Sequence, residues 1–258
     1  MNPIPLAIML LLALFAGILA CTELGRRHGL RRFAADPEAA QRGTGPVDGA
    51  IFALLGLMIA FTFSSAASRF EGRRELVREE ANDIGTAWLR LDLLAEPQRT
   101  ELHGLFRQYT DSRIETYLRA DDIDRALAEY RHSEEIQGRI WTLAVKAAAE
   151  QRTDAASRLL LPALNEMFDI ANTRRAAAMM HQPPIVFAML GLLALLAAVV
   201  AGFSLASGRG RNWLHLVIFA AITTLTVYVI ADLEYPRLGL IRVDSIDQLL
   251  RDVRAGMK

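Results

Sequence analysis

Residues Ile51 to Asn82 read IFALLGLMIAFTFSSAASRFEGRRELVREEAN, an apolar stretch followed directly by a charged one. The segment holds no proline and no glycine-rich turn, so nothing in it interrupts a helix. We therefore predict one continuous helix that leaves the hydrocarbon of a membrane and enters water. Such a helix joins a membrane-spanning part of a protein to a domain outside the membrane.

The chain has four apolar blocks of spanning length, at residues 3–21, 47–67, 184–206 and 213–233. Each block has roughly 20 residues without a charge in its middle, which matches a hydrocarbon core about 30 Å thick. With 52% hydrophobic and 22% charged residues, the 258-residue chain is too apolar for an ordinary soluble domain and too charged for membrane spans alone. The sequence predicts an all-α membrane protein with four transmembrane helices and a central helical extramembrane domain.

The first block has an alternative interpretation as a secretory or lipoprotein signal, with ILAC ending at Cys21. Its leading residues MNPIP carry no positive charge, and Leu19 is bulky for a lipoprotein cleavage site. The arginines follow the block instead of preceding it. We therefore expect a transmembrane helix followed by an arginine-rich loop at 22–46. The single cysteine excludes an intrachain disulfide and a cysteine-based metal site.

The central segment, residues 68–182, has helical signals throughout. Apolar residues recur at three- and four-residue steps from Leu76 to Leu94, as in an amphipathic helix. Pro97 suits the first turn of a second helix, and Asp121 and Asp122 suit the cap of a third. Thr153 or Asp154 opens a fourth, which Pro162 is expected to kink or interrupt. The tail, 234–258, is expected to contain a short amphipathic helix.

Basic residues flank the spans on both sides, so the positive-inside rule leaves the orientation open. The short loops contain Arg26, Arg27, Arg31, Arg32, Arg42, Arg209 and Arg211, which favours both loops in the cytoplasm. The central domain and the tail contain the opposing set Arg69, Arg73, Arg74, Arg78, Arg174, Arg175, Arg237 and Arg242. Lysine occurs only at Lys146 and Lys258, and this preference for arginine indicates a bacterium with a GC-rich genome. We expect a multi-pass protein of the bacterial inner membrane.

Three patches resemble the bestrophin anion channels and the bacterial bestrophin-like membrane proteins. AFTFSSAASRFEGRREL is similar to the second bestrophin helix, with Arg69, Phe70, Arg74 and Leu76 at matching positions. ANTRRAAAMMHQPPIVF, from Ala171, resembles the segment that ends at a proline pair before the third bestrophin helix. DLEYPRLGLIRV, from Asp232, is similar to the acidic patch that follows the last bestrophin helix. The resemblance covers the chain from about Val47 onward.

The resemblance implies a homo-oligomer in the lipid bilayer, with a pentamer as the expected assembly and the second span lining a path for small anions. Ala53, Leu57 and Phe61 form an i, i+4, i+8 row on that span. Around an axis such a row would make a hydrophobic gate; the alternative is that it packs against a neighbouring helix. Ala53 is smaller than the usual apolar neck residue of bestrophins, and no counterpart of the calcium-binding clasp of animal bestrophins is identified.

Asp232 and Glu234 at the end of the fourth span are candidates for the mouth of a pore, together with Arg69 and Arg74. Ionisable groups at membrane depth are usually functional and paired. These four lie at the membrane edge, where water reaches them, and structural ion pairs between the acids and the arginines are the favoured interpretation.

The residues predict no catalytic, metal or cofactor site. Glu79, Glu80, Asn82 and Asp83 lack a histidine at ligand spacing and are expected to form solvated pairs with arginines one turn away. The five histidines, Cys21 and the serines form no nucleophile–base pattern, and no basic patch with aromatics indicates nucleic acid binding. The sequence leaves two functions open: an oligomeric anion channel, or a non-conducting membrane-anchored sensor or scaffold.

Overall fold

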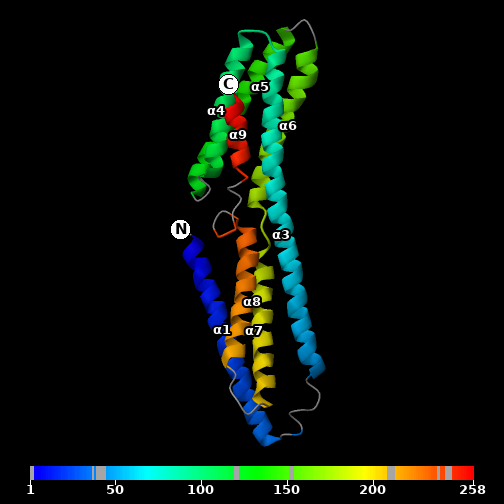
Figure 1. The fold of residues 1–258 in the computed structure, drawn as a ribbon, viewed down its shortest axis with the longest axis vertical. Helices are drawn as coiled ribbons and strands as arrows, with labels where there is room; N and C mark the ends of the chain where they lie inside the picture. Colours follow the sequence, from blue (N-terminus) through cyan, green and yellow to red (C-terminus); the bar gives the residue numbers. More distant parts are fainter. Residues whose placement is uncertain are drawn as a thin grey trace. The chain divides into compact units, whose positions relative to one another are not determined.

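The computed structural model describes residues 3–36, 38, 45–118, 122–150, 154–207, 213–236, 239–241 and 246–258. These residues are almost entirely helical and contain no strand, which confirms the all-α prediction. The chain divides into two compact units (Figure 1). Unit 1 comprises Met1–Arg69 and His181–Leu240, and unit 2 comprises Phe70–Met180 and Ile241–Lys258.

Unit 1 contains the apolar helices α1 (Pro3–Ala35), α7 (Pro184–Ser204) and α8 (Trp213–Glu234), and the first part of α3 (Gly45–Arg90). A 3₁₀ turn, η3 (Leu205–Ser207), follows α7. Four helical stretches are long and apolar enough to cross a membrane, namely Pro5–Ala35, Gly45–Leu93, Ala156–Ser204 and Trp213–Glu234. The protein is therefore a membrane protein with four candidate spans.

Helix α1 extends beyond the expected end of the first span and includes much of the segment that was predicted as a loop at 22–46. No proline lies between Pro5 and Pro37, and Arg27 Nε donates to Glu23 Oε1 at 2.9 Å along the helix. Residues 37 and 39–44, including Arg42, lie outside the described residues, as do Arg209 and Arg211.

Helices α1 and α7 pack with their backbones in contact, because glycines lie where they cross. A Cβ atom on Gly25 would lie 2.0 Å from the carbonyl oxygen of Val199, and one on Gly202 would lie 1.9 Å from that of Thr22. Since small residues let membrane helices approach closely, these glycines fix the position of α7 on α1. Helix α1 also packs against α8.

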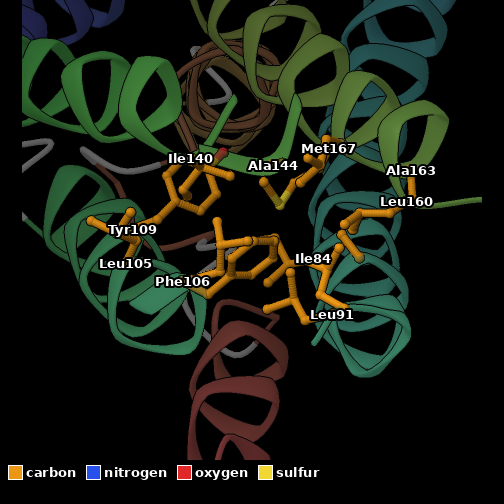
Figure 2. Packing of buried hydrophobic residues seen from close by; sticks show 14 of the residues in the cluster. Ile84, Leu91, Leu105, Phe106, Tyr109, Ile140, Ala144, Leu160, Ala163 and Met167 are labelled. Carbon is orange, nitrogen blue, oxygen red and sulfur yellow. The ribbon is translucent and has the colours of Figure 1, made fainter. Parts of the chain in front are cut away.

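Unit 2 contains the rest of α3, the turn η1 (Leu91–Leu93), α4 (Gln98–Leu118), α5 (Ile123–Glu150), α6 (Leu161–Met179) and α9 (Gln248–Gly256). Helix α4 packs against α5 and α9. Figure 2 shows the apolar core that these helices enclose, built from Ile84, Leu91, Leu105, Phe106, Tyr109, Ile140, Ala144, Leu160, Ala163 and Met167.

Two helix boundaries in unit 2 follow from single residues. The amide of Arg125 donates to Asp122 Oδ1 at 3.2 Å, so Asp122 caps the start of α5. Asp121 and Thr153 lie outside the described residues. Before Pro162 the chain forms a π-helical turn, η2 (Ala156–Leu160), because proline has no amide hydrogen with which to continue the backbone hydrogen bonds of an α-helix.

The tail forms α9, whose Leu250 is buried in the core of unit 2. Arg254 Nε and Nη2 donate to the two carboxylate oxygens of Asp111 on α4, at 2.7 and 2.9 Å. Arg237 and Arg242 lie outside the described residues.

Candidate functional site

The membrane part of α3 has one covered face and one open face within unit 1. Leu55, Thr62 and Ala66 are buried, with 5%, 4% and 0% of their surface exposed. At 3.6 residues per turn these three fall on one narrow stripe. Ala53, Leu57 and Phe61 lie on the opposite side, and Leu57 and Phe61 expose 51% and 64% of their surface. Among the described residues of unit 1, therefore, no helix covers the predicted row.

The open face becomes polar toward the end of unit 1. Ser64 and Ser68 are exposed and continue the side of α3 that carries Phe61. Thr62, on the covered side, donates its hydroxyl to the carbonyl oxygen of Met58 at 2.7 Å. The open face thus combines apolar side chains with hydroxyl groups that are available to water or a passing ion.

Polar contacts at two places and an aromatic contact attach α3 to other described residues of unit 1. Near its start, Ser204 Oγ donates to Asp48 Oδ2 at 3.0 Å, and the rings of Phe52 and Phe219 meet edge to face at 6.4 Å. Farther along, Arg69 binds the carboxylate of Glu234 at the end of α8. The structure therefore brings together two of the predicted ion-pair residues, Arg69 and Glu234.

The Glu234 carboxylate is fully buried and accepts several hydrogen bonds. Arg69 Nε lies 3.1 and 3.0 Å from its two oxygens, and the amide of Gln182 donates to Oε1 at 2.6 Å. The Arg69 guanidinium also donates to the side-chain oxygens of Gln182 and, at 2.7 Å, of Ser65. A carboxylate removed from water requires this bonding, because a buried unpaired charge is costly.

Asp232 and Arg74 have other partners. The amide of Leu240 donates to both carboxylate oxygens of Asp232, each at 3.1 Å. The backbone passes so close that a Cβ on Gly239 would lie 1.2 Å from Asp232 Oδ1, which explains the glycine. Arg74 Nη1 donates to Glu71 Oε2 on the same helix at 2.8 Å. Asp232 therefore holds Gly239 and Leu240 beside it, and Arg74 forms an exposed pair in unit 2.

Unit 2 contains a buried ionic network that sequence reasoning missed. Glu80 is fully buried and accepts from Arg113 of α4 and Arg174 of α6. Arg174 Nη2 also donates to Asp247 Oδ1 at 2.8 Å. The prediction that Glu80 forms a solvated pair within its own helix is wrong, because its partners come from helices far away in the sequence. Glu79, the next residue back, is exposed as predicted.

Aromatic rings enclose the two arginines of this network. The Arg174 guanidinium lies 3.5 Å from the centre of the Tyr117 ring, and Arg113 lies 5.2 Å from it. Burial lowers the pKa of Arg113, but the Glu80 carboxylate together with Tyr117 and Tyr109 outweighs this effect and raises the pKa well above its usual value. Arg113 therefore stays charged, and the network locks α3, α4 and α6 of unit 2 together.

Across the described part of the chain, no group of three or more metal-ligating side chains gathers in one place. The acids near Asp83 include Glu79 and Glu166, and burial together with their negative charge raises the pKa of the Asp83 carboxyl above its usual value. Within those residues the open face of α3, with the Arg69–Glu234 cluster beside it, is the strongest candidate for function.

Comparisons with known proteins agree on one family. Residues 10–246 match the model of the Bestrophin-like domain. A bacterial bestrophin homologue from Klebsiella pneumoniae superposes with a TM-score of 0.65 at 14% identity, covering 92% of this chain and 97% of that one. A variant of that homologue gives a TM-score of 0.69 at 13% identity, with 94% and 98% covered. No curated protein matches.

These similarities differ in what they establish. At 13–14% identity the solved structures show a shared fold only. The family model spans nearly the whole chain, including the three patches that resemble bestrophins. The predicted family is thereby confirmed, and this chain belongs to the bestrophin-like domain family.

Proposed function

We propose that the protein forms a homo-oligomeric channel for small anions in the inner membrane of a bacterium, with α3 of each copy lining the path. The observation that carries this proposal is the open face of α3, where Leu57 and Phe61 expose about half or more of their surface opposite the packed stripe. Family membership supports a channel, and the resemblance to bestrophins supports a pentamer.

The chemistry of the open face supports a water-filled path more than contact with lipid along its whole length. A face that meets only lipid needs no hydroxyls, whereas Ser64 and Ser68 are exposed on the side that carries Phe61. Ala53, Leu57 and Phe61 would form successive apolar rings around an axis. Such rings control ion passage by excluding water until the path widens.

Chloride flux into liposomes tests the proposal. We expect flux through the wild-type protein, and an increase in Leu57→Ala and Phe61→Ala, because smaller side chains let water fill the constriction. Leu192→Ala on α7 is the matched control, because Leu192 is also 56% exposed but does not lie on α3. Equal flux in the control and the α3 variants, or no flux in any protein, would overturn the proposal.

The oligomeric state in mild detergent gives a second test, since a path around an axis needs several copies. A monomer or a dimer would contradict the axial arrangement. It would favour the second candidate function, a membrane-anchored sensor or scaffold. The compact core and buried ionic network of unit 2 suit that alternative, because a well-packed helical domain can hold a binding surface in place.

A further inference from the structure

His181 lies beside the buried carboxylate that anchors α3. Its Nδ1 is 3.9 Å from Glu234 Oε1, and its ring centre is 4.5 Å from that of Tyr235. The His181 side chain is 34% exposed, whereas that of Glu234 is 0% exposed. Water can therefore deliver a proton to the histidine while the carboxylate stays shielded.

Several ionisable groups face His181. Among the described residues they include Glu234, which is the last residue of α8, the adjacent Tyr235, and Arg69, which binds the same carboxylate from α3. Tyrosine is neutral at physiological pH, and Arg69 balances Glu234. Histidine gains its charge between about pH 8 and pH 5, so acidification adds one positive charge to this cluster.

This charge lies close to the proposed path. Arg69 follows Phe61 by about two turns of α3, and its guanidinium donates to Ser65 Oγ at 2.7 Å, one turn beyond Phe61. A helix is only about 10 Å across, which is comparable to the screening length at 0.1 M salt. A positive charge at this range raises the local concentration of anions and lowers that of cations.

We propose that His181 is a proton-sensitive residue that sets the charge beside the open face of α3, so that acid increases the passage of anions. The change in flux rests on the proposed channel function. The change in potential near α3 does not, and it can be measured whether or not the protein conducts.

His132 provides a matched control within the same chain. Its Nδ1 lies 3.8 Å from Glu135 Oε2, nearly the distance between His181 and Glu234. Both members of the control pair are exposed, at 57% and 78%, so water and salt screen their charges. The two histidines thus have the same type of partner in opposite surroundings.

The first experiment measures chloride flux into liposomes between pH 8 and pH 5. We expect wild-type flux to rise by at least about threefold on acidification, and His181→Gln to show no rise, because glutamine is polar but does not titrate. His132→Gln should keep the wild-type profile. A His181→Gln profile that matches wild type would overturn the inference and leave the proposed channel intact.

The second experiment measures the potential directly, with Ser64→Cys in a Cys21→Ala background. The reaction rate of the introduced thiol with an anionic methanethiosulfonate is divided by its rate with a neutral one, which removes the effect of thiol ionisation. We expect this ratio to rise on acidification, and the rise to disappear when His181→Gln is added. An unchanged ratio would overturn the inference even if the protein conducts.

Combined outcomes separate the two proposals. If the ratio rises with acid but no ion crosses the membrane, the role of His181 stands and the channel proposal fails. If the current is carried by cations and falls on acidification in the wild type but not in His181→Gln, the role of His181 again stands, and the assignment of anions is wrong.

Discussion

The two parts of α3 follow opposite packing rules, although they belong to one helix. In unit 1 the apolar Leu57 and Phe61 are exposed, whereas in unit 2 the apolar Ile84 and Ala87 are completely buried. Unit 2 also buries the charge of Glu80 in its interior. The difference shows that unit 2 is organised like a water-soluble helical domain, whereas the surface of unit 1 is suited to lipid or to other copies of the chain.

The strongest test of this contrast removes the charge of Glu80. We expect Glu80→Gln to lower the free energy of unfolding by about 3–5 kcal/mol, because Arg113 and Arg174 would remain buried without their shared carboxylate. Chemical or thermal unfolding of the full chain in detergent measures the change. Glu79→Gln is the control, since Glu79 is exposed. Equal losses in both variants would show that the network does not stabilise unit 2.

Two phenylalanines test the apolar side of the contrast. Phe106 is fully buried in unit 2, so Phe106→Ala should cost about 3–5 kcal/mol of folding free energy. Phe61 is 64% exposed, and Phe61→Ala should cost less than about 1 kcal/mol within a subunit. Unfolding of dissociated subunits separates the two. A similar cost for both would mean that the face carrying Phe61 is covered within the chain.

The crossing of α1 and α7 should be sensitive to a single methyl group. Gly202→Ala places a Cβ against the Thr22 carbonyl, which is backbone and cannot rotate away, so we expect a loss of about 1–3 kcal/mol. Gly191→Ala on the same helix meets nothing within 4 Å and should be neutral or slightly stabilising. Unfolding in detergent compares them, and a stable Gly202→Ala would contradict the close backbone contact.

The smallest expected effect concerns pH and the surface of unit 2. Burial against Trp88, with ring centres 4.2 Å apart, lowers the pKa of His103 below its usual value, although Asp92 partly opposes this. In the unfolded chain the His103 imidazole takes up a proton near pH 6.5, whereas in the folded chain its lowered pKa means that it does so only at a lower pH. His103 therefore contributes stability above that pH and loses it as the pH falls. We expect His103→Gln to unfold with a weaker dependence on acid, and an unaltered dependence would rule out this contribution.

Local sequence patterns predicted the helices, because the apolar length, the cap and the end of a helix depend on neighbouring residues. The apolar blocks, the cap at Asp122 and the break at Pro162 depend on residues within a turn or two. The end of α1 did not follow from its pattern, because charged residues such as Arg27 can continue a helix as well as end a span. The pairing of Arg69 with Glu234 was expected, since both residues lie where a span meets water.

The sequence by itself determined the four apolar helices, the helical central domain and the family, because hydrophobic length, periodicity and short motifs are properties of adjacent residues. Only the tertiary structure decided which charges are buried together. Glu80 meets Arg113 and Arg174 across 33 and 94 residues, and no local pattern encodes a contact at that separation. The tertiary structure also decided which side of α3 is covered, because that depends on where α3 contacts other helices and not on the residues of α3 alone.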